Sequence, residues 1–234
     1  MSISDRVKGR TSEDVSPEDV TKLLEKIEAG GAESFKPAGL LLEAAEQYPD
    51  LIAKHHDHLA SVLNTVLPPL VRRQLYDVVL KTEITSPESL KKIIDSAEAD
   101  LIEGDATTRE HIYQIIELAA NEGVDVNKSD LEAFIQGIAA SPADTPADSA
   151  MDAYLASVTN RDPVGNEELA PLIDFIESDF PEIRSAASEA LVNIVIETTI
   201  EPDTNTDGIR MVLEDHESNS LPADRVTTAV EKLS

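Results

Sequence analysis

A unit of two amphipathic helices, with an arginine near the start of the second, recurs along this chain and limits the fold more than any other feature. The clearest copy spans residues 169–195, where apolar residues recur every three or four positions on both sides of the turn "SDFP". Its arginine is Arg184. Arg109 lies 75 positions earlier, and Arg73 lies another 36 positions before that. A residue that recurs with the repeat is expected to serve the architecture rather than a single catalytic step.

Two helices per unit at this period predict an α-solenoid. The same step places one more unit near Ala147 and outer units at Lys36 and Asp224. We therefore predict an all-α fold, an α-α superhelix of about six helix pairs. Residues 1–16 are polar and are predicted to be a flexible segment, and 17–234 are predicted to form a single helical-repeat domain.

Spaced leucines in the first helix, an aspartate in the turn and an arginine early in the second helix resemble the HEAT-repeat family, which is related to armadillo repeats. In this resemblance, Asp105 with Arg109 and Asp179 with Arg184 occupy positions where the family places an aspartate and an arginine that bond along the stack. Arg73 occupies the arginine position without an aspartate before it. The resemblance implies a non-enzymatic scaffold that binds a protein segment on its concave surface.

In such stacks the outward row of the second helices lines the concave surface, so the resemblance also implies which polar residues would face a partner. A solvated acidic face is the alternative interpretation of the same row, because the whole chain is acidic. The row comprises Asp77, Glu110, Gln114, Glu117, Asp148, Asp152, Ser185, Ser188 and Glu189.

The stretch "DTNTDGIRMVLE" fits the spacing of a calcium-binding loop, with Asp203, Asn205 and Asp207 at alternate positions, a glycine sixth and Glu214 twelfth. The alternative is a loop between repeats in which Asp207 caps the next helix. We expect no cofactor, with calcium at this loop as the alternative.

Two further hypotheses concern metal binding and catalysis. His55 and His58 in "KHHDHL" could share a helical face and bind a transition metal, although His55 is in register with apolar neighbours and is then expected to be half-buried, with the other histidines solvated. There is no cysteine nucleophile, phosphate-binding glycine loop or serine triad motif. We therefore expect no enzyme activity, with a small-ligand-binding or bilin-lyase-like HEAT enzyme as the alternative.

Composition points to an environment. The chain has 46 acidic and 19 basic residues, a net charge of −27 and no cysteine. Such charge destabilises a compact chain unless salt screens it, and the pattern resembles the proteins of extreme halophiles. A basic footprint for nucleic acid is missing, as are a membrane-spanning apolar run and an apolar signal segment. We expect a protein or peptide partner in a salt-rich cytoplasm.

Overall fold

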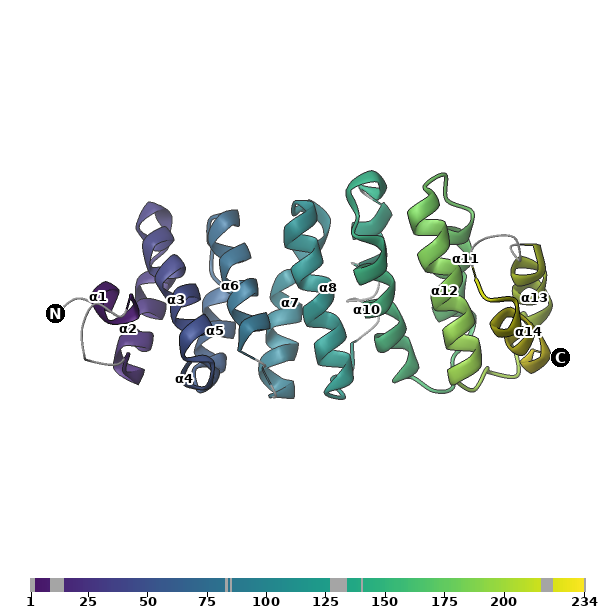
Figure 1. Cartoon of the computed structure of the whole chain (residues 1–234), viewed down its shortest axis with the longest axis horizontal. Coiled ribbons are helices and arrows are strands. Elements are labelled where there is room, and N and C mark those ends of the chain that lie inside the picture. Colours follow the sequence, from purple (N-terminus) through teal and green to yellow (C-terminus); the bar gives the residue numbers. More distant parts are fainter. Residues whose placement is uncertain are drawn as a thin grey trace. The chain divides into compact units, whose positions relative to one another are not determined.

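The computed structural model describes residues 3–8, 15–82, 84, 86–126, 134–139, 141–215 and 221–233. Within these residues the regular structure is helical apart from one isolated parallel bridge between Val164 and Ile200 (Figure 1). The helices are α1 Ile3–Val7, α2 Pro17–Glu28, α3 Phe35–Gln47, α4 Pro49–Ala53, α5 His56–Leu63, α6 Pro69–Lys81, α7 Pro87–Glu103, α8 Ala106–Asn121, an unlabelled helix at 134–139, α10 Ala147–Thr159, α11 Asn166–Ile176, α12 Pro181–Glu197, α13 Thr206–Asp215 and α14 Ala223–Lys232. Short 3-10 turns occupy Gly31–Ser34 and Pro142–Asp144.

The longer helices in the described residues form the six expected pairs, which confirms the all-α prediction. The pairs are α2 with α3, α5 with α6, α7 with α8, the helix at 134–139 with α10, α11 with α12, and α13 with α14. Contacts divide the chain into two compact units, Met1–Ile115 and Ile116–Ser234, here called unit 1 and unit 2. The boundary falls inside α8. That 17–234 behave as one domain stays a prediction.

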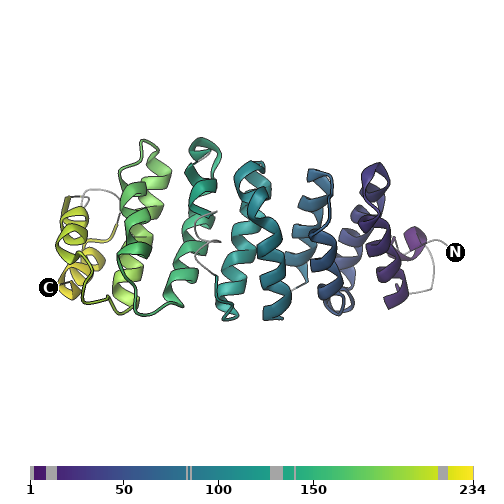
Figure 2. The same ribbon diagram turned by 180° about the vertical axis from the view of Figure 1, so that it is seen from behind.

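Unit 1 has two layers of helices, which Figure 1 and, from behind, Figure 2 display. The first helices α2, α5 and α7 pack side by side, and the second helices α3 and α6 pack on each other. Within the pairs, α2 packs on α3 and α5 on α6. The segment predicted to be flexible contains α1, which packs against α3 and buries Val7; residues 1, 2 and 9–14 of it lie outside the described part.

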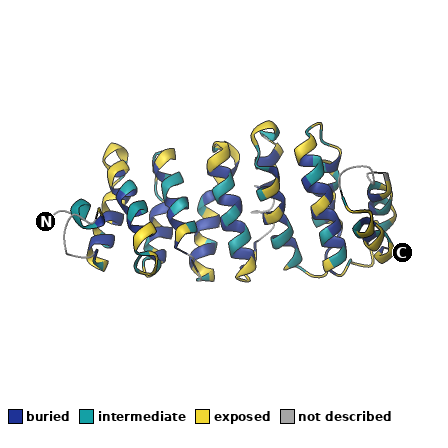
Figure 3. Ribbon diagram, in the orientation of Figure 1, coloured by how far each residue is buried: buried dark blue, intermediate teal, exposed yellow. Residues whose placement is uncertain are grey.

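Unit 2 follows the same rule. The second helices form a layer in which α12 lies between α10 and α14, while α11 packs on α12 and α13 on α14. Buried positions recur along these helices between exposed ones (Figure 3). Leu, Ile, Val and Ala make up most of the buried hydrophobic residues, as expected from a chain with few aromatic residues.

Proline and serine determine where several helices begin. Pro17 opens α2, and the hydroxyl of Ser16 accepts a hydrogen bond from the Asp19 amide, while the Asp19 carboxylate accepts one from the Ser16 amide. Pro181 opens α12 at the start predicted from "SDFP". Since proline lacks an amide hydrogen, it fits the first turn, where that hydrogen would have no partner in the helix.

The recurring arginine is the fourth residue of its helix: Arg72 in α6, Arg109 in α8 and Arg184 in α12. This corrects the assignment of Arg73, which is the fifth residue of α6. The reason is that α6 begins at Pro69, the second proline of the "PP" turn, and this start shifts the register by one residue.

The guanidinium of Arg72 lies at the centre of a polar network in unit 1. It donates to the Leu63 carbonyl and the Ser96 carbonyl, each at 2.6 Å, and to the Asp100 carboxylate at 2.5 Å. It also donates to the Tyr76 hydroxyl at 2.9 Å, which in turn donates to Asp100 at 2.6 Å. These bonds connect α5, α6 and α7. Arg73 makes a more exposed ion pair with Asp105 at 3.2 Å.

The aspartate–arginine pairs implied by the family resemblance differ in the structure. Asp105 accepts from the Thr108 amide at 2.8 Å, and so caps α8, and it pairs with Arg73 of the preceding repeat rather than with Arg109. Arg184 donates to the Ser178 carbonyl at 2.6 Å, whereas Asp179 is exposed and does not bond to it. The tie along the stack is therefore present at Asp105 and absent at Asp179.

Tyrosine recurs at the eighth position of three second helices: Tyr76 in α6, Tyr113 in α8 and Tyr154 in α10. All three side chains are buried. By this register the fourth pair has Ala150, not Ala147, in place of the arginine. Arginine at the fourth helix position and tyrosine at the eighth are therefore one turn apart. The sequence analysis identified only the arginine as a recurring residue.

Candidate functional site

Three members of the predicted second-helix row come together in unit 2. Asp148 and Asp152 of α10 and Glu189 of α12 line one hollow of about 330 Å³, which we call the acidic hollow. Its apolar lining comes from Met151, Leu155, Ala186 and Ala190, and Asn193 completes it. The pairs 148/152 and 189/193 are each one helical turn apart, so each helix presents two polar side chains on the same side.

The carboxylates of this hollow repel one another. Burial raises the pKa of Asp152, and the neighbouring Asp148 and Glu189 raise it further. Burial likewise raises the pKa of Glu117 on α8, with a contribution from Asp152. The four predicted residues therefore share one region of negative potential, which a bound cation would stabilise.

Two features adjoin the acidic hollow. A second hollow of about 490 Å³ shares Asp148 and includes Ser185 of the predicted row, together with Glu182. On the other side, Arg225 of α14 donates to the Asn193 side-chain oxygen and lies 4.0 Å from the Glu189 carboxylate. The wall of the hollow thus already accepts one guanidinium from the chain itself.

The remaining row members need separate description. Ser188 is buried, with its hydroxyl donating to the Arg184 carbonyl at 2.8 Å, so its assignment to the exposed row was wrong: the residue lies on the inner side of α12. In unit 1, Asp77 lies 3.9 Å from Lys81, which also pairs with Glu46 of α3. Glu110 and Gln114 are half-buried on α8.

No protein-family model matches the chain, and no curated protein matches it. Solved structures do match. A designed armadillo repeat protein in complex with the peptide (KR)4 superposes with a TM-score of 0.59, at 14% identity, over 92% of this chain and 100% of its own. The chain has an armadillo-like helical-repeat fold.

Two other solved structures agree. An engineered protein from a structural genomics consortium has a TM-score of 0.60 at 16% identity, covering 92% of this chain and 96% of its own. A second designed armadillo repeat protein gives 0.54 at 16% identity, with coverages of 92% and 100%. At such identities the similarity establishes the armadillo-like fold and nothing about specific residues.

The loop that fits a calcium site begins a helix in this armadillo-like chain. Asn205, rather than Asp207, caps α13, since its side-chain oxygen accepts from the Gly208 amide at 3.1 Å. The Asp207 carboxylate pairs with Arg210 at 2.8 Å. Asn166 holds the loop by accepting from the Asn205 amide at 2.9 Å and donating to the Asp203 carbonyl at 3.2 Å. Glu214 lies near the end of α13. Of the two interpretations of this spacing, calcium binding would require these contacts to change, whereas the helix-capping interpretation would not.

His55 is half-buried, as expected from its register. His56 was expected to be solvated but is buried, and its Nε2 lies 2.9 Å from the Thr82 hydroxyl. That hydroxyl donates to the Val78 carbonyl, so His56 Nε2 is the donor to it. Burial lowers the pKa of His56 to about 4. His58 is 3.9 Å from Glu28. Across the described ranges, no three His, Cys, Asp or Glu side chains gather in a way that could hold a metal ion.

The sequence analysis missed the apolar residues that line the acidic hollow. Met151 and Leu155 belong to the face of α10 that the periodicity assigns to the core, yet both reach the hollow between α10 and α12. Their one-turn spacing alongside Asp148 and Asp152 is the signal that could have identified them.

In the part of the chain that the structure describes, no helix is long and apolar enough to cross a membrane.

Proposed function

We propose that this chain is a non-enzymatic scaffold that binds an extended protein segment carrying lysine or arginine side chains. The acidic hollow is the observation that carries this proposal, because it combines carboxylates from two neighbouring second helices with apolar lining residues. A lysine or arginine side chain has the matching chemistry, an aliphatic stem with a cationic end.

Two further points support the proposal. The carboxyl pKa values of Asp152 and Glu117 are raised by burial and by neighbouring carboxylates, so a cation placed among them would relieve an existing cost. A designed protein of the same fold is in complex with (KR)4, a peptide that alternates lysine and arginine. We further propose a salt-rich cytoplasm as the environment, on the basis of the net charge of −27.

Fluorescence anisotropy with labelled (KR)4 tests the function. We expect saturable binding that is weakened about three- to tenfold in Asp152→Asn/Glu189→Gln, since each exposed ion pair contributes up to about 1 kcal/mol. Asp174→Asn/Glu177→Gln is the matched control, because it changes the net charge by the same amount. Asp174 is an exposed residue of α11, and Glu177 is the exposed residue that follows this helix.

The salt concentration must be held constant at a value where circular dichroism shows a folded chain. At molar salt the screening length is only about 3 Å, so the remaining affinity reports direct contacts. An equal loss in the two double variants would contradict the assignment to the acidic hollow. Failure of (KR)4 to bind at any salt concentration would contradict the proposed partner class.

A further inference from the structure

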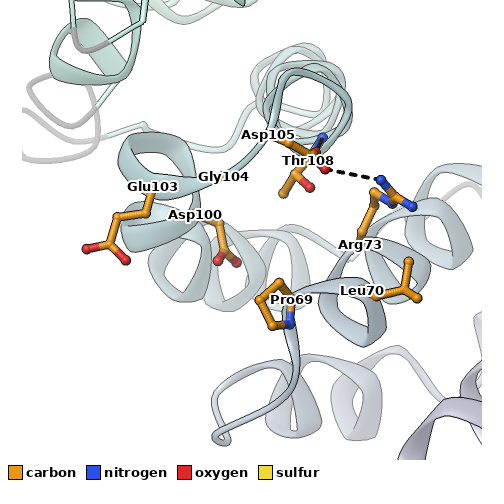
Figure 4. Close-up of a pocket in the computed structure, with 8 residues that line it drawn as sticks. All are labelled: Pro69, Leu70, Arg73, Asp100, Glu103, Gly104, Asp105 and Thr108. Atoms are coloured by element: carbon orange, nitrogen blue, oxygen red, sulfur yellow. Dashed lines mark hydrogen bonds and ion pairs between the residues drawn. The ribbon is translucent and has the colours of Figure 1, made fainter.

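A separate hollow opens in unit 1, where the start of α6 faces the turn between α7 and α8 (Figure 4). Its volume is about 440 Å³, within the range of pockets that hold a ligand or an anchoring side chain. Its lining residues are Pro69, Leu70, Arg73, Asp100, Glu103, Gly104, Asp105 and Thr108. We call it the α6–α8 hollow.

One side of the α6–α8 hollow is apolar and open to solvent. Leu70 is 43% exposed, one of few large hydrophobic residues so placed in the described chain, and it lies beside Pro69 in the first turn of α6. Gly104 adds no side chain to the opposite wall, where a Cβ would lie 2.3 Å from the Asp100 carbonyl oxygen and 3.1 Å from the Thr108 methyl group. Covering Leu70 would remove apolar surface from water.

The other side carries charge, and most of it is already neutralised. Asp100 accepts from the Arg72 guanidinium and the Tyr76 hydroxyl. Asp105 accepts from the Thr108 amide and from Arg73.

Glu103 differs from both of these carboxylates. It is exposed at the end of α7 and makes no hydrogen bond or ion pair with any described residue. The charge left without a partner among the lining residues is therefore a single carboxylate, which lies across the hollow from Leu70 (Figure 4).

We propose that the α6–α8 hollow docks a segment of a partner protein in which a large aliphatic side chain is followed directly by a lysine or arginine. The aliphatic side chain covers Leu70 and Pro69, and the cation faces Glu103. An acidic segment would place its charge against Glu103, which disfavours it. This surface is made of unit 1 residues only and does not depend on the acidic hollow of unit 2.

Three short Gly/Ser peptides test the proposal, containing a Leu-Lys, a Leu-Glu or a Ser-Lys pair. Binding is followed by NMR on leucine-methyl-labelled chain, with the Leu70 signals assigned by their loss in Leu70→Ala. We expect Leu-Lys to shift the Leu70 signals and to bind about tenfold more tightly than Ser-Lys. It should bind about two- to fivefold more tightly than Leu-Glu, because an exposed ion pair adds little.

Matched variants separate local contacts from the general attraction of an acidic chain. Glu103→Lys should reverse the preference in favour of Leu-Glu, whereas Glu98→Lys, exposed on the same helix but outside the hollow, should keep it. Leu70→Ala should weaken Leu-Lys binding more than Ile102→Ala, a partly exposed residue of α7 that does not line the hollow.

Each outcome counts for or against the proposal. Equal binding of Leu-Lys and Ser-Lys, shifts confined to other leucines, no binding, or an unchanged preference in Glu103→Lys would each overturn it. Melting temperatures identify any variant that fails to fold. If Leu70→Ala fails to fold, Glu103→Lys still tests the proposal, because it changes an exposed residue.

Discussion

At the scale of single residues, the arginines at the fourth helix position occupy the same place in their helices but make different contacts. Arg72 bonds to two carbonyls, a carboxylate and a hydroxyl. Arg109 is only 2% exposed and lies near Tyr113, whereas Arg184 donates to one carbonyl in its own turn. The position permits burial of the aliphatic stem, and the neighbouring repeat decides which acceptors the guanidinium meets.

Replacing Arg72 should be much more damaging than replacing Arg73. Arg72→Gln leaves Asp100 and two carbonyls short of a charged donor, so we expect a loss of about 3 kcal/mol in the free energy of unfolding. Arg73→Gln changes the net charge equally but breaks only an exposed pair with Asp105, and should cost about 0.5 kcal/mol or less.

Thermal and urea unfolding at one salt concentration would measure both changes. Asp100→Asn serves as a third variant, because it weakens the same network from the acceptor side. Similar losses in Arg72→Gln and Arg73→Gln would mean that the network is not the main source of stability at this position.

The register error at Arg73 shows a limit of sequence reasoning. Two prolines, Pro68 and Pro69, precede two arginines, and either proline could open the helix. Only the structure places the start at Pro69. Sequence patterns identify a recurring residue type, but adjacent identical residues need the helix start to be known before their faces can be separated.

At the scale of elements, the sequence predicted the helix pairs well, but it predicted the roles of the residues at helix ends less well. The starts at Pro17 and Pro181 agree with the prediction. The spacing of residues 203–214 fits two structures at once, because the oxygen-bearing side chains that bind calcium are also those that cap helices. Local spacing could not decide between them, since Asn166, which holds the loop, is 37 residues before Asp203.

Because Asn205 caps α13, we expect it to contribute to stability without binding calcium. Asn205→Ala should lower the stability of α13 by about 1 kcal/mol, through loss of the acceptor for the Gly208 amide. Calorimetry with millimolar calcium should give only the heat of dilution, and the melting temperature should not rise.

A saturable calcium heat that disappears in Asp207→Asn would contradict this expectation. It would mean that calcium competes successfully with Arg210 for the Asp207 carboxylate. Asp174→Asn, a change of one carboxylate outside the loop, is the control for non-specific attraction of calcium to an acidic chain.

At the scale of the whole molecule, charge and fold oppose each other. The net charge of −27 is spread over helices whose cores are built mainly from aliphatic side chains. Raised carboxyl pKa values at Asp152 and Glu117 show the repulsion locally, after the effect of burial. The six pairs could be predicted because periodicity survives this charge, whereas the contacts of individual acids depend on which helices become neighbours.

We expect helicity to be partial at low ionic strength and to rise in molar KCl, with an increase in melting temperature. Far-ultraviolet circular dichroism measures both. Sucrose at matched osmolality is the control, because it favours compact states without screening charge. Full helicity and the same melting temperature at low and molar KCl would show that self-repulsion does not limit this fold.

The tyrosine ladder gives the protein its own optical probes. Tryptophan is absent, and Tyr76, Tyr113 and Tyr154 place one buried chromophore in each of three successive pairs. Burial raises the pKa of all three phenols, that of Tyr113 to about 12. Tyrosinate absorbance in moderately alkaline solution therefore reports the opening of the repeat around each ring. Replacing Tyr48, the fourth tyrosine of the chain, and two of these three with phenylalanine isolates the signal of one repeat.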